Sequence, residues 1–203
     1  MHDQPTPTPD DADQPAHDAT PDADHFSQQV QHVPVSARVP EHVARGVFST
    51  GVLVQTGRHE FIFDFLLMLA RPHQVVARVV MPFAVIPSFI TALRQNLDIY
   101  TQQFGPPQPL PKPPPGATVP PIDEIYSQLK LPDEVAVGAY ANGVLISHSP
   151  SEFVFDFIAS FYPRSSVSAR IFLTTPQVPR FLESLIRSFD QLQRRQPPNP
   201  NTP

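Results

Sequence analysis

The chain of 203 residues contains 28 prolines and neither cysteine nor tryptophan, so disulfides, thiolate metal sites and cysteine nucleophiles are excluded. Its formal net charge is −5, and the first forty residues hold seven Asp against one Arg, a sum of −6 that leaves +1 for the remainder. The remainder lacks the clustered Lys and Arg that nonspecific nucleic-acid binding requires, so a nucleic-acid partner is not favoured.

Residues 1–40 are rich in Asp, Pro, Thr and Gln and have few large apolar residues before Val30. Such a composition cannot bury enough apolar surface to fold, so we predict a disordered acidic tail. The segment has neither the basic nor the apolar region of a signal peptide, and no apolar run in the chain approaches the length of a membrane span. We therefore expect a cytoplasmic protein without membrane association.

An internal duplication follows the tail. When residues 43–98 are placed on residues 135–190, at a constant offset of 92, 18 of 56 positions are identical. We predict a first repeat at residues 41–104, a proline-rich linker at 105–130, a second repeat at 131–195 and a disordered C-terminus at 196–203.

Each repeat has the same predicted elements in chain order. A strand at 47–56 or 139–148 is followed by a turn and by E-F-I-F-D-F-L or E-F-V-F-D-F-I, whose alternating Phe favours a second strand. A helix is the alternative for that segment, because Phe153, Phe157 and Phe161 are also four residues apart. A third strand, V-V-A-R-V-V-M or V-S-A-R-I-F-L, precedes a helix with apolar residues on one face.

These elements predict an α+β fold made of two tandem β-β-β-α repeats. One such unit covers only one face of its sheet, so we expect the repeats to pack about a pseudo-twofold axis as an antiparallel sheet with helices on one face. Between them, residues 105–121 contain nine prolines and should form an extended polyproline II spacer. A docking site for a proline-reading domain is the alternative for this spacer.

Residues 131–158, L-P-D-E-V-A-V-G-A-Y-A-N-G-V-L-I-S-H-S-P-S-E-F-V-F-D-F-I, together with S-A-R-I-F-L-T-T-P at 168–176, carry a family resemblance. They resemble DUF3467, a prokaryotic domain family of unknown function, and the first repeat resembles it more weakly. The resemblance implies continuity of fold without an assigned activity. It also implies that single-copy relatives form homodimers, of which this chain is the fused and diverged equivalent.

Charged residues recur at equivalent positions in both repeats. The set consists of Glu60, Asp64 and Arg78, repeated as Glu152, Asp156 and Arg170. Paired carboxylates beside an arginine could carry out acid–base chemistry. A cross-strand ion pair that sets the register of the strands explains the same residues without a cleft, and we favour this structural role.

Four residues of the second repeat are candidates for binding: Tyr140, Asn142, His148 and Ser149. Tyr140 could instead be a packed core residue. His148 beside several serines could form a base and nucleophile, but S-H-S-P-S is also ordinary turn sequence, and we favour the turn. No nucleotide-binding, metalloprotease or hydrolase signature is present, so we predict no catalytic residue, metal or cofactor.

We expect a non-enzymatic binding or assembly module that acts through protein–protein contacts, as an intramolecular pseudo-dimer or a homo-oligomer. Two alternatives remain open. Single-stranded nucleic acid could stack on aromatic residues of the sheet face. A chaperone-like module could hold apolar segments in a groove between the sheet and the helices.

Overall fold

The computed structural model describes residues 37–112, 114, 116, 120–161 and 163–195. Most of the predicted acidic tail and the predicted C-terminal segment 196–203 lie outside these residues. In each repeat of the described chain a run of strands is followed by one long helix, so the fold is α+β. None of the described helices is long and apolar enough to cross a membrane.

Both repeats contain the same series of elements. The first comprises α1 (Glu41–Ala44), β1 (Val47–Ser49), β2 (Gly51–Thr56), β3 (Glu60–Leu67), β4 (His73–Pro82), the 3-10 turn η1 (Phe83–Val85) and α2 (Ile86–Phe104). The second comprises α4 (Asp133–Ala136), β6 (Ala139–Tyr140), β7 (Gly143–His148), β8 (Glu152–Phe161), β9 (Arg164–Thr174), η2 (Thr175–Gln177) and α5 (Val178–Arg195). The E-F-hydrophobic-F-D-F segments are therefore strands, not helices.

Two further elements lie inside the predicted linker. They are α3 (Ile122–Ser127) and β5 (Leu129–Lys130), and β5 pairs in parallel with β4 through His73 and Gln74. Helix α3 begins directly after the spacer predicted at residues 105–121, and the last nine residues of the predicted linker 105–130 contain a helix and a short strand.

Alternating aromatic residues explain why β3 and β8 form the centres of two sheets. Their Phe side chains at every second position are completely buried against the helices: Phe61, Phe63, Phe65, Phe153, Phe155 and Phe157. Burial of each phenyl ring contributes roughly 2–3 kcal/mol. The strand period of two therefore fixes which face of each sheet meets the helices.

The strands form two sheets, where the sequence predicted one antiparallel sheet. Sheet A has the order β1-β9-β8-β7, and sheet B has the order β2-β3-β4, with both β5 and β6 paired to β4. Neighbouring long strands within a repeat are antiparallel, whereas β1, β5 and β6 pair in parallel. The prediction of an antiparallel sheet is therefore wrong for these short edge strands.

The repeats exchange their first short strands. Strand β1 of the first repeat pairs with β9 of the second, with Val47 opposite Ile171, and β6 of the second repeat pairs with β4 of the first, with Ala139 opposite Val79. The predicted single strand at 47–56 is interrupted at Thr50, where the chain leaves sheet A and enters sheet B. The corresponding interruption in the second repeat lies at residues 141–142.

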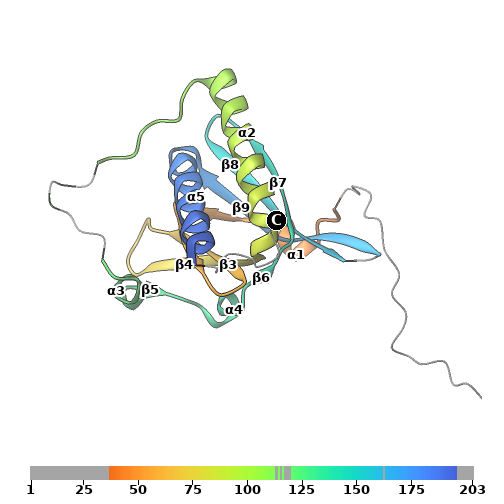
Figure 1. The fold of residues 1–203 in the computed structure, drawn as a ribbon, viewed down its shortest axis with the longest axis horizontal. Helices are drawn as coiled ribbons and strands as arrows, with labels where there is room; N and C mark the ends of the chain where they lie inside the picture. Colours follow the sequence, from red (N-terminus) through yellow and green to blue (C-terminus); the bar gives the residue numbers. More distant parts are fainter. Residues whose placement is uncertain (1–36, 113, 115, 117–119, 162, 196–203) are drawn as a thin grey trace, which may run out of the picture. The chain divides into compact units, whose positions relative to one another are not determined.

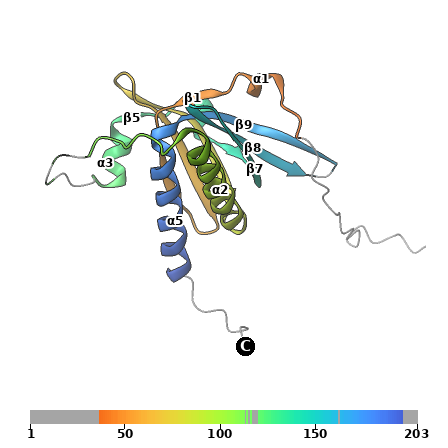
Figure 2. The same cartoon turned by 90° about the horizontal axis from the view of Figure 1, so that it is seen from above.

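The two long helices are exchanged as well. Helix α2 of the first repeat contacts β7 of the second, helix α5 contacts β2 of the first, and the helices contact each other. Figures 1 and 2 show α2 and α5 side by side on the same side of the sheets, with α1 on the opposite side. Phe63 and Phe157 from the two sheets stack at 6.3 Å between Phe89 of α2 and Phe181 of α5. The repeats therefore share one hydrophobic core.

Candidate functional site

Each sheet carries one cross-strand ion pair on the face that points away from α2 and α5. Asp64 of β3 is opposite Arg78 of β4, and the guanidinium donates to both carboxylate oxygens at 2.7 and 2.8 Å. Asp156 of β8 and Arg170 of β9 form the same bidentate pair, with both distances at 2.7 Å. Such fork-to-fork pairs fix strand register as well as adding electrostatic energy.

Each arginine also holds a loop of the other repeat. Arg78 donates to the carbonyl of Ala136 at the end of α4, and Arg170 donates to the carbonyl of Ala44 at the end of α1, at 3.0 and 3.3 Å. Both carbonyls thereby gain a charged donor. The ion pairs are therefore part of the connection between the repeats.

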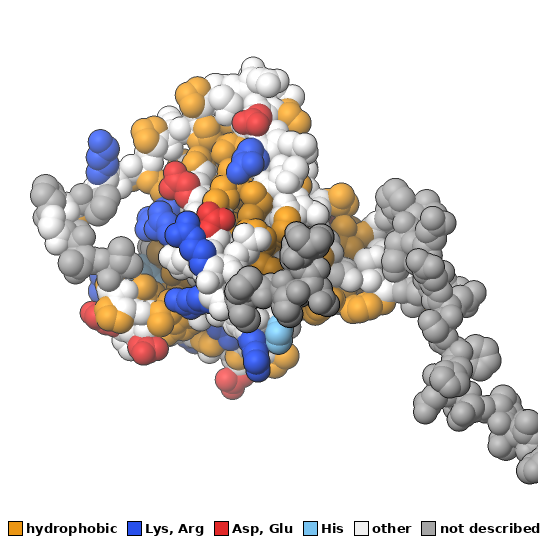
Figure 3. Space-filling view, in the orientation of Figure 1, with side chains coloured by type: hydrophobic (Ala, Val, Ile, Leu, Met, Phe, Trp, Pro, Cys, Tyr) orange, Lys and Arg blue, Asp and Glu red, His pale blue; other side chains and the backbone are white. Residues whose placement is uncertain are grey.

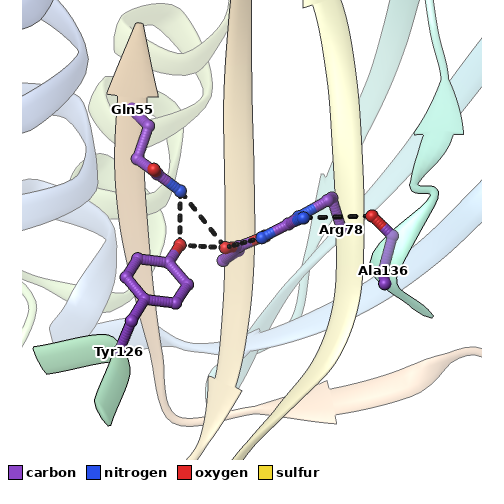
Figure 4. A network of polar contacts seen from close by, with 5 residues as sticks. Gln55, Arg78, Tyr126 and Ala136 are labelled. Carbon is purple, nitrogen blue, oxygen red and sulfur yellow. Dashed lines mark hydrogen bonds and ion pairs between the residues drawn. The ribbon is translucent and has the colours of Figure 1, made fainter. Parts of the chain in front are cut away.

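A segment of the chain itself covers the first ion pair (Figure 4). Tyr126 of α3 donates its phenol hydrogen to Asp64, and Gln55 of β2 donates to both Tyr126 and Asp64. The Asp64 side chain has no exposed surface and that of Arg78 is 17% exposed. We call this surface, defined by Leu53, Asp64 and Arg78, the closed face of sheet B.

Enclosure changes the proton affinities at the closed face. Burial, and next the hydrogen bond to Asp64, raise the pKa of Tyr126 above the usual value for a phenol. The hydrogen bond to Asp64 also raises the pKa of Arg78. Both groups therefore keep their protons at neutral pH, as required of two donors that converge on one buried carboxylate.

The second ion pair is open. The side chains of Arg170 and Asp156 are 24% and 18% exposed, and within the part of the chain that the structure describes, Asp156 has no hydrogen-bond donor besides Arg170. Leu145 of β7, which lies opposite Asp156, is 57% exposed. We call this surface, defined by Leu145, Asp156 and Arg170, the open face of sheet A.

The two glutamates of the predicted charged set lie outside the ion pairs. Glu60 accepts a hydrogen bond from the backbone N–H of His59 at the β2–β3 turn. Glu152 begins β8 opposite Thr174, at the corresponding turn of the second repeat. The predicted trio therefore reduces to one aspartate and one arginine in each repeat.

His148 is the last residue of β7, opposite Phe153 of β8, and Ser149 begins the turn between the two strands. The His148 ring packs against Tyr100 and Phe104 of α2 and against Phe153. The Ser149 hydroxyl oxygen accepts the backbone N–H groups of Ser151 and Glu152 at 3.2 and 3.3 Å, as in an ordinary serine turn. The Tyr100 hydroxyl donates to the Pro150 carbonyl at 3.0 Å and joins this turn to α2 of the first repeat.

Tyr140 and Asn142 lie where the second repeat changes sheet. The Asn142 side chain exchanges two hydrogen bonds with the backbone of Ser160, at 2.9 and 2.8 Å, and so acts as a substitute for a strand neighbour. Tyr140 is exposed and stacks on the exposed ring of Phe161 at 5.4 Å. Neither residue contacts the open face through a hydrogen bond in the described residues.

Sequence reasoning did not find Tyr126, Leu145 or Phe161. Tyr126 lies in a segment that was interpreted as linker, although Ile122 and Ile125 three residues apart are typical of one turn of an amphipathic helix. Leu145 occupies an apolar strand position that is identical in the first repeat, so its exposure depends on tertiary packing and not on local pattern.

Both repeats match the model of one known protein family. The family model DUF3467, described as a protein of unknown function, matches residues 8–109 and again residues 111–196. The chain belongs to the DUF3467 family. The two consecutive matches identify it as a tandem duplication of the DUF3467 domain. No curated protein matches the sequence.

The two DUF3467 repeats enclose a hollow of ≈ 500 Å³ between α1 and α4, above β4 and β9. Equivalent positions of both repeats line it, among them Gly46 and Gly138 and the paired Arg78 and Arg170. Both guanidinium groups already bind a carboxylate and a carbonyl, and Glu134 adds negative charge at the rim. In the described ranges, no group of three His, Asp or Glu residues could hold a metal ion.

Proposed function

We propose that this protein is a non-enzymatic protein-binding module. In this proposal the two DUF3467 repeats form an intramolecular pseudo-dimer about a pseudo-twofold axis, and the open face of sheet A binds a protein partner. The observation that carries the proposal is the difference between two equivalent surfaces, because the chain covers the closed face with its own helix while the open face exposes Leu145 beside an accessible ion pair.

Reciprocal contacts support the pseudo-twofold arrangement. The strand register β1–β9 and the register β6–β4 are related by the 92-residue offset of the duplication. The same offset relates the bond from Arg170 to Ala44 with the bond from Arg78 to Ala136. A homodimer of single repeats would make each of these contacts twice, which is the pattern of an isologous interface.

The exposed residues support a binding role for the open face. Leu145 lies on β7, which is the last strand of sheet A and has no strand neighbour on its outer side in the described chain. Edge strands with exposed apolar side chains readily add a further chain, and native proteins normally cover them. Sheet B carries such a cover, since Pro120, Ile122 and Ile125 line a hollow together with the edge strand β2.

The geometry gives less support to the other hypotheses. Among the described residues, the two aspartates of the sheets bind their arginines and His148 packs against aromatic rings, an arrangement that does not favour a base-and-nucleophile pair. The Phe side chains of β3 and β8 are buried, so these strands offer no aromatic surface on which bases could stack. The aromatic core fills the centre of the space between the sheets and the helices, and the hollow at the edge between β2 and α5 is lined by the chain's own Ile122 and Ile125.

Comparative affinity capture tests the proposal. Baits of the wild-type chain, Leu145→Asp and the control Leu69→Asp are exposed to a lysate of the native host, and each recovered protein is then purified and titrated by calorimetry. Leu69 is 73% exposed beyond β3, so its substitution changes surface hydrophobicity elsewhere. We expect a partner that binds the wild type and the control but not Leu145→Asp.

Two results would contradict the proposal. One is the recovery of the same proteins by all three baits, since the open face would then contribute nothing. The other is a hydrolytic activity that disappears in His148→Ala while circular dichroism shows an unchanged fold, since the protein would then be an enzyme.

A further inference from the structure

The closed face shows how these repeats bind a short helical segment. Helix α3 places Ile122 and Ile125 in a hollow of ≈ 450 Å³ between β2 and α5, and it places Tyr126 over the ion pair of Asp64 and Arg78. Both aliphatic side chains line this hollow at the sheet edge, and Ile122 keeps 44% of its surface exposed. The phenol hydroxyl adds a further donor to the buried carboxylate, which also accepts hydrogen bonds from Arg78 and Gln55.

The leucine, aspartate and arginine of this binding surface have identical equivalents at the open face, whereas Gln55, which bonds Tyr126, is replaced by Ser147. Leu53, Asp64 and Arg78 correspond at the 92-residue offset to Leu145, Asp156 and Arg170, and the strand registers are the same. Helix α2 carries a hollow of ≈ 340 Å³ that is lined by α2 residues alone, whereas the hollow of the closed face is lined by both β2 and α5. The lining residues of the α2 hollow include Ser88, Ala92 and Gln95, equivalent to Arg180, Ser184 and Arg187.

We propose that the open face binds a helical segment of a partner protein in which two aliphatic residues three apart are followed directly by a tyrosine. The tyrosine hydroxyl donates to Asp156, and the aliphatic residues contact Leu145 and the adjoining side of α2. This inference rests on the proposed function and adds the chemistry of the partner.

Asp156 can accept further hydrogen bonds, and for this reason the partner segment needs a hydroxyl donor. Each oxygen of Asp156 accepts one bond from Arg170, and each carboxylate oxygen can accept two. When a partner covers Leu145, it also removes water from Asp156. A segment without a donor would then leave part of the carboxylate desolvated and unpaired, whereas a tyrosine restores the bond that Tyr126 makes to Asp64.

Charge distinguishes the partner segment from α3. Helix α3 carries Asp123 and Glu124 in its first turn, and the α5 wall beside it carries Arg180 and Arg187. Figure 3 shows Lys and Arg side chains gathered over α5, which also carries Arg194 and Arg195 in its last turn. At the open face, the corresponding wall of α2 carries Ser88 and Gln95. The partner segment therefore gains nothing from acidic residues between or before its aliphatic anchors.

A labelled peptide tests this chemistry. The probe is a fluorescein-labelled peptide with the sequence of residues 120–130 and the changes Asp123→Ser and Glu124→Gln, titrated with the full chain by fluorescence anisotropy. We expect saturable binding that weakens about tenfold when the peptide tyrosine is replaced by phenylalanine, since a bond to a charged acceptor is lost. We expect a loss of at least tenfold with Leu145→Asp in the chain and no change with Leu69→Asp.

Three results would overturn the inference. If the peptide fails to bind while a purified partner still requires Leu145, the proposed function stands and the partner chemistry is wrong. Equal binding to Leu145→Asp would place the peptide elsewhere, for example on the closed face. Val30 and Val33 stand 92 residues before Ile122 and Ile125. If the peptide binds only after Val30 and Val33 are both changed to aspartate, the open face serves a segment of this chain and not a partner protein.

Discussion

Replacement of Tyr126 by phenylalanine removes one hydroxyl group from the closed face and leaves the ring in place. A hydrogen bond to a charged group contributes about 1.5–3 kcal/mol. Asp64 keeps both bonds from Arg78 and the 3.3 Å bond from Gln55, so the lower end of that range applies. We expect Tyr126→Phe to lower the free energy of unfolding by about 1.5 kcal/mol, which for a domain of this size lowers Tm by roughly 3–6 °C.

Urea unfolding followed by circular dichroism measures this change, and Tyr140→Phe is the matched control. The Tyr140 hydroxyl makes no hydrogen bond within the described chain, and the ring is exposed, so its loss should stay within about 0.5 kcal/mol. Equal stability of the two variants would refute the role of the phenol in closing the face.

The difference in stability between the wild-type chain and Tyr126→Phe should depend on pH. Burial, and next the hydrogen bond to Asp64, raise the pKa of Tyr126 in the folded state, so folding favours the neutral phenol. Its contribution is fully present below the unfolded tyrosine pKa of about 10 and is lost as the pH rises through the higher folded value. The stability difference between wild type and Tyr126→Phe should therefore be constant up to about pH 10 and shrink above it.

Further predictions concern the two ion pairs, the exchanged loops and the linker. Asp64→Asn should cost about 3 kcal/mol because it leaves a largely buried arginine unpaired, whereas Asp156→Asn at the open face should cost about 1 kcal/mol in the same urea assay. Gly138→Ala should cost about 2 kcal/mol, since Gly138 has φ +79° and an added Cβ would lie 2.9 Å from Cγ of Arg78, whereas Gly143→Ala, with no atom nearer than 3.9 Å, should be neutral. Protease cleavage at a site introduced at residues 106–112 should leave the two halves together in native size-exclusion chromatography, because they share strands and one core. Separate elution of the halves would contradict the strand exchange.

Local sequence patterns predicted most of the secondary structure. The alternating Phe of E-F-V-F-D-F predicted β8, and the apolar spacing of Phe181, Leu185 and Leu192 predicted α5, because strand and helix periods are properties of consecutive residues. The exchange of β1 and β6 could not be predicted in this way. Which strand a short segment joins depends on contacts that are distant in the sequence, since Val47 pairs with Ile171 and Ala139 with Val79, and the interruption at Thr50 follows from that pairing.

The candidate site depends even more on tertiary structure. The aspartate, the arginine and the leucine are identical in both repeats, so their sequence alone makes the two faces indistinguishable. The difference comes from α3, a helix of six residues that is too short to be stable without packing against the sheet. For the same reason, the sequence of this segment predicts a linker, and only its contacts with Gln55 and Asp64 explain the helix.

Chemical-shift mapping distinguishes the open face of sheet A from the closed face of sheet B in solution. The full chain, labelled with ¹⁵N, is titrated with the tyrosine peptide, and amide shifts are compared at equivalent positions of the two repeats. The account predicts shifts at Leu145, Asp156 and Arg170 with a stoichiometry of one peptide per chain, and none at Leu53, Asp64 and Arg78. Shifts of equal size at both sets of residues would show that the faces are equivalent in solution and would contradict the account.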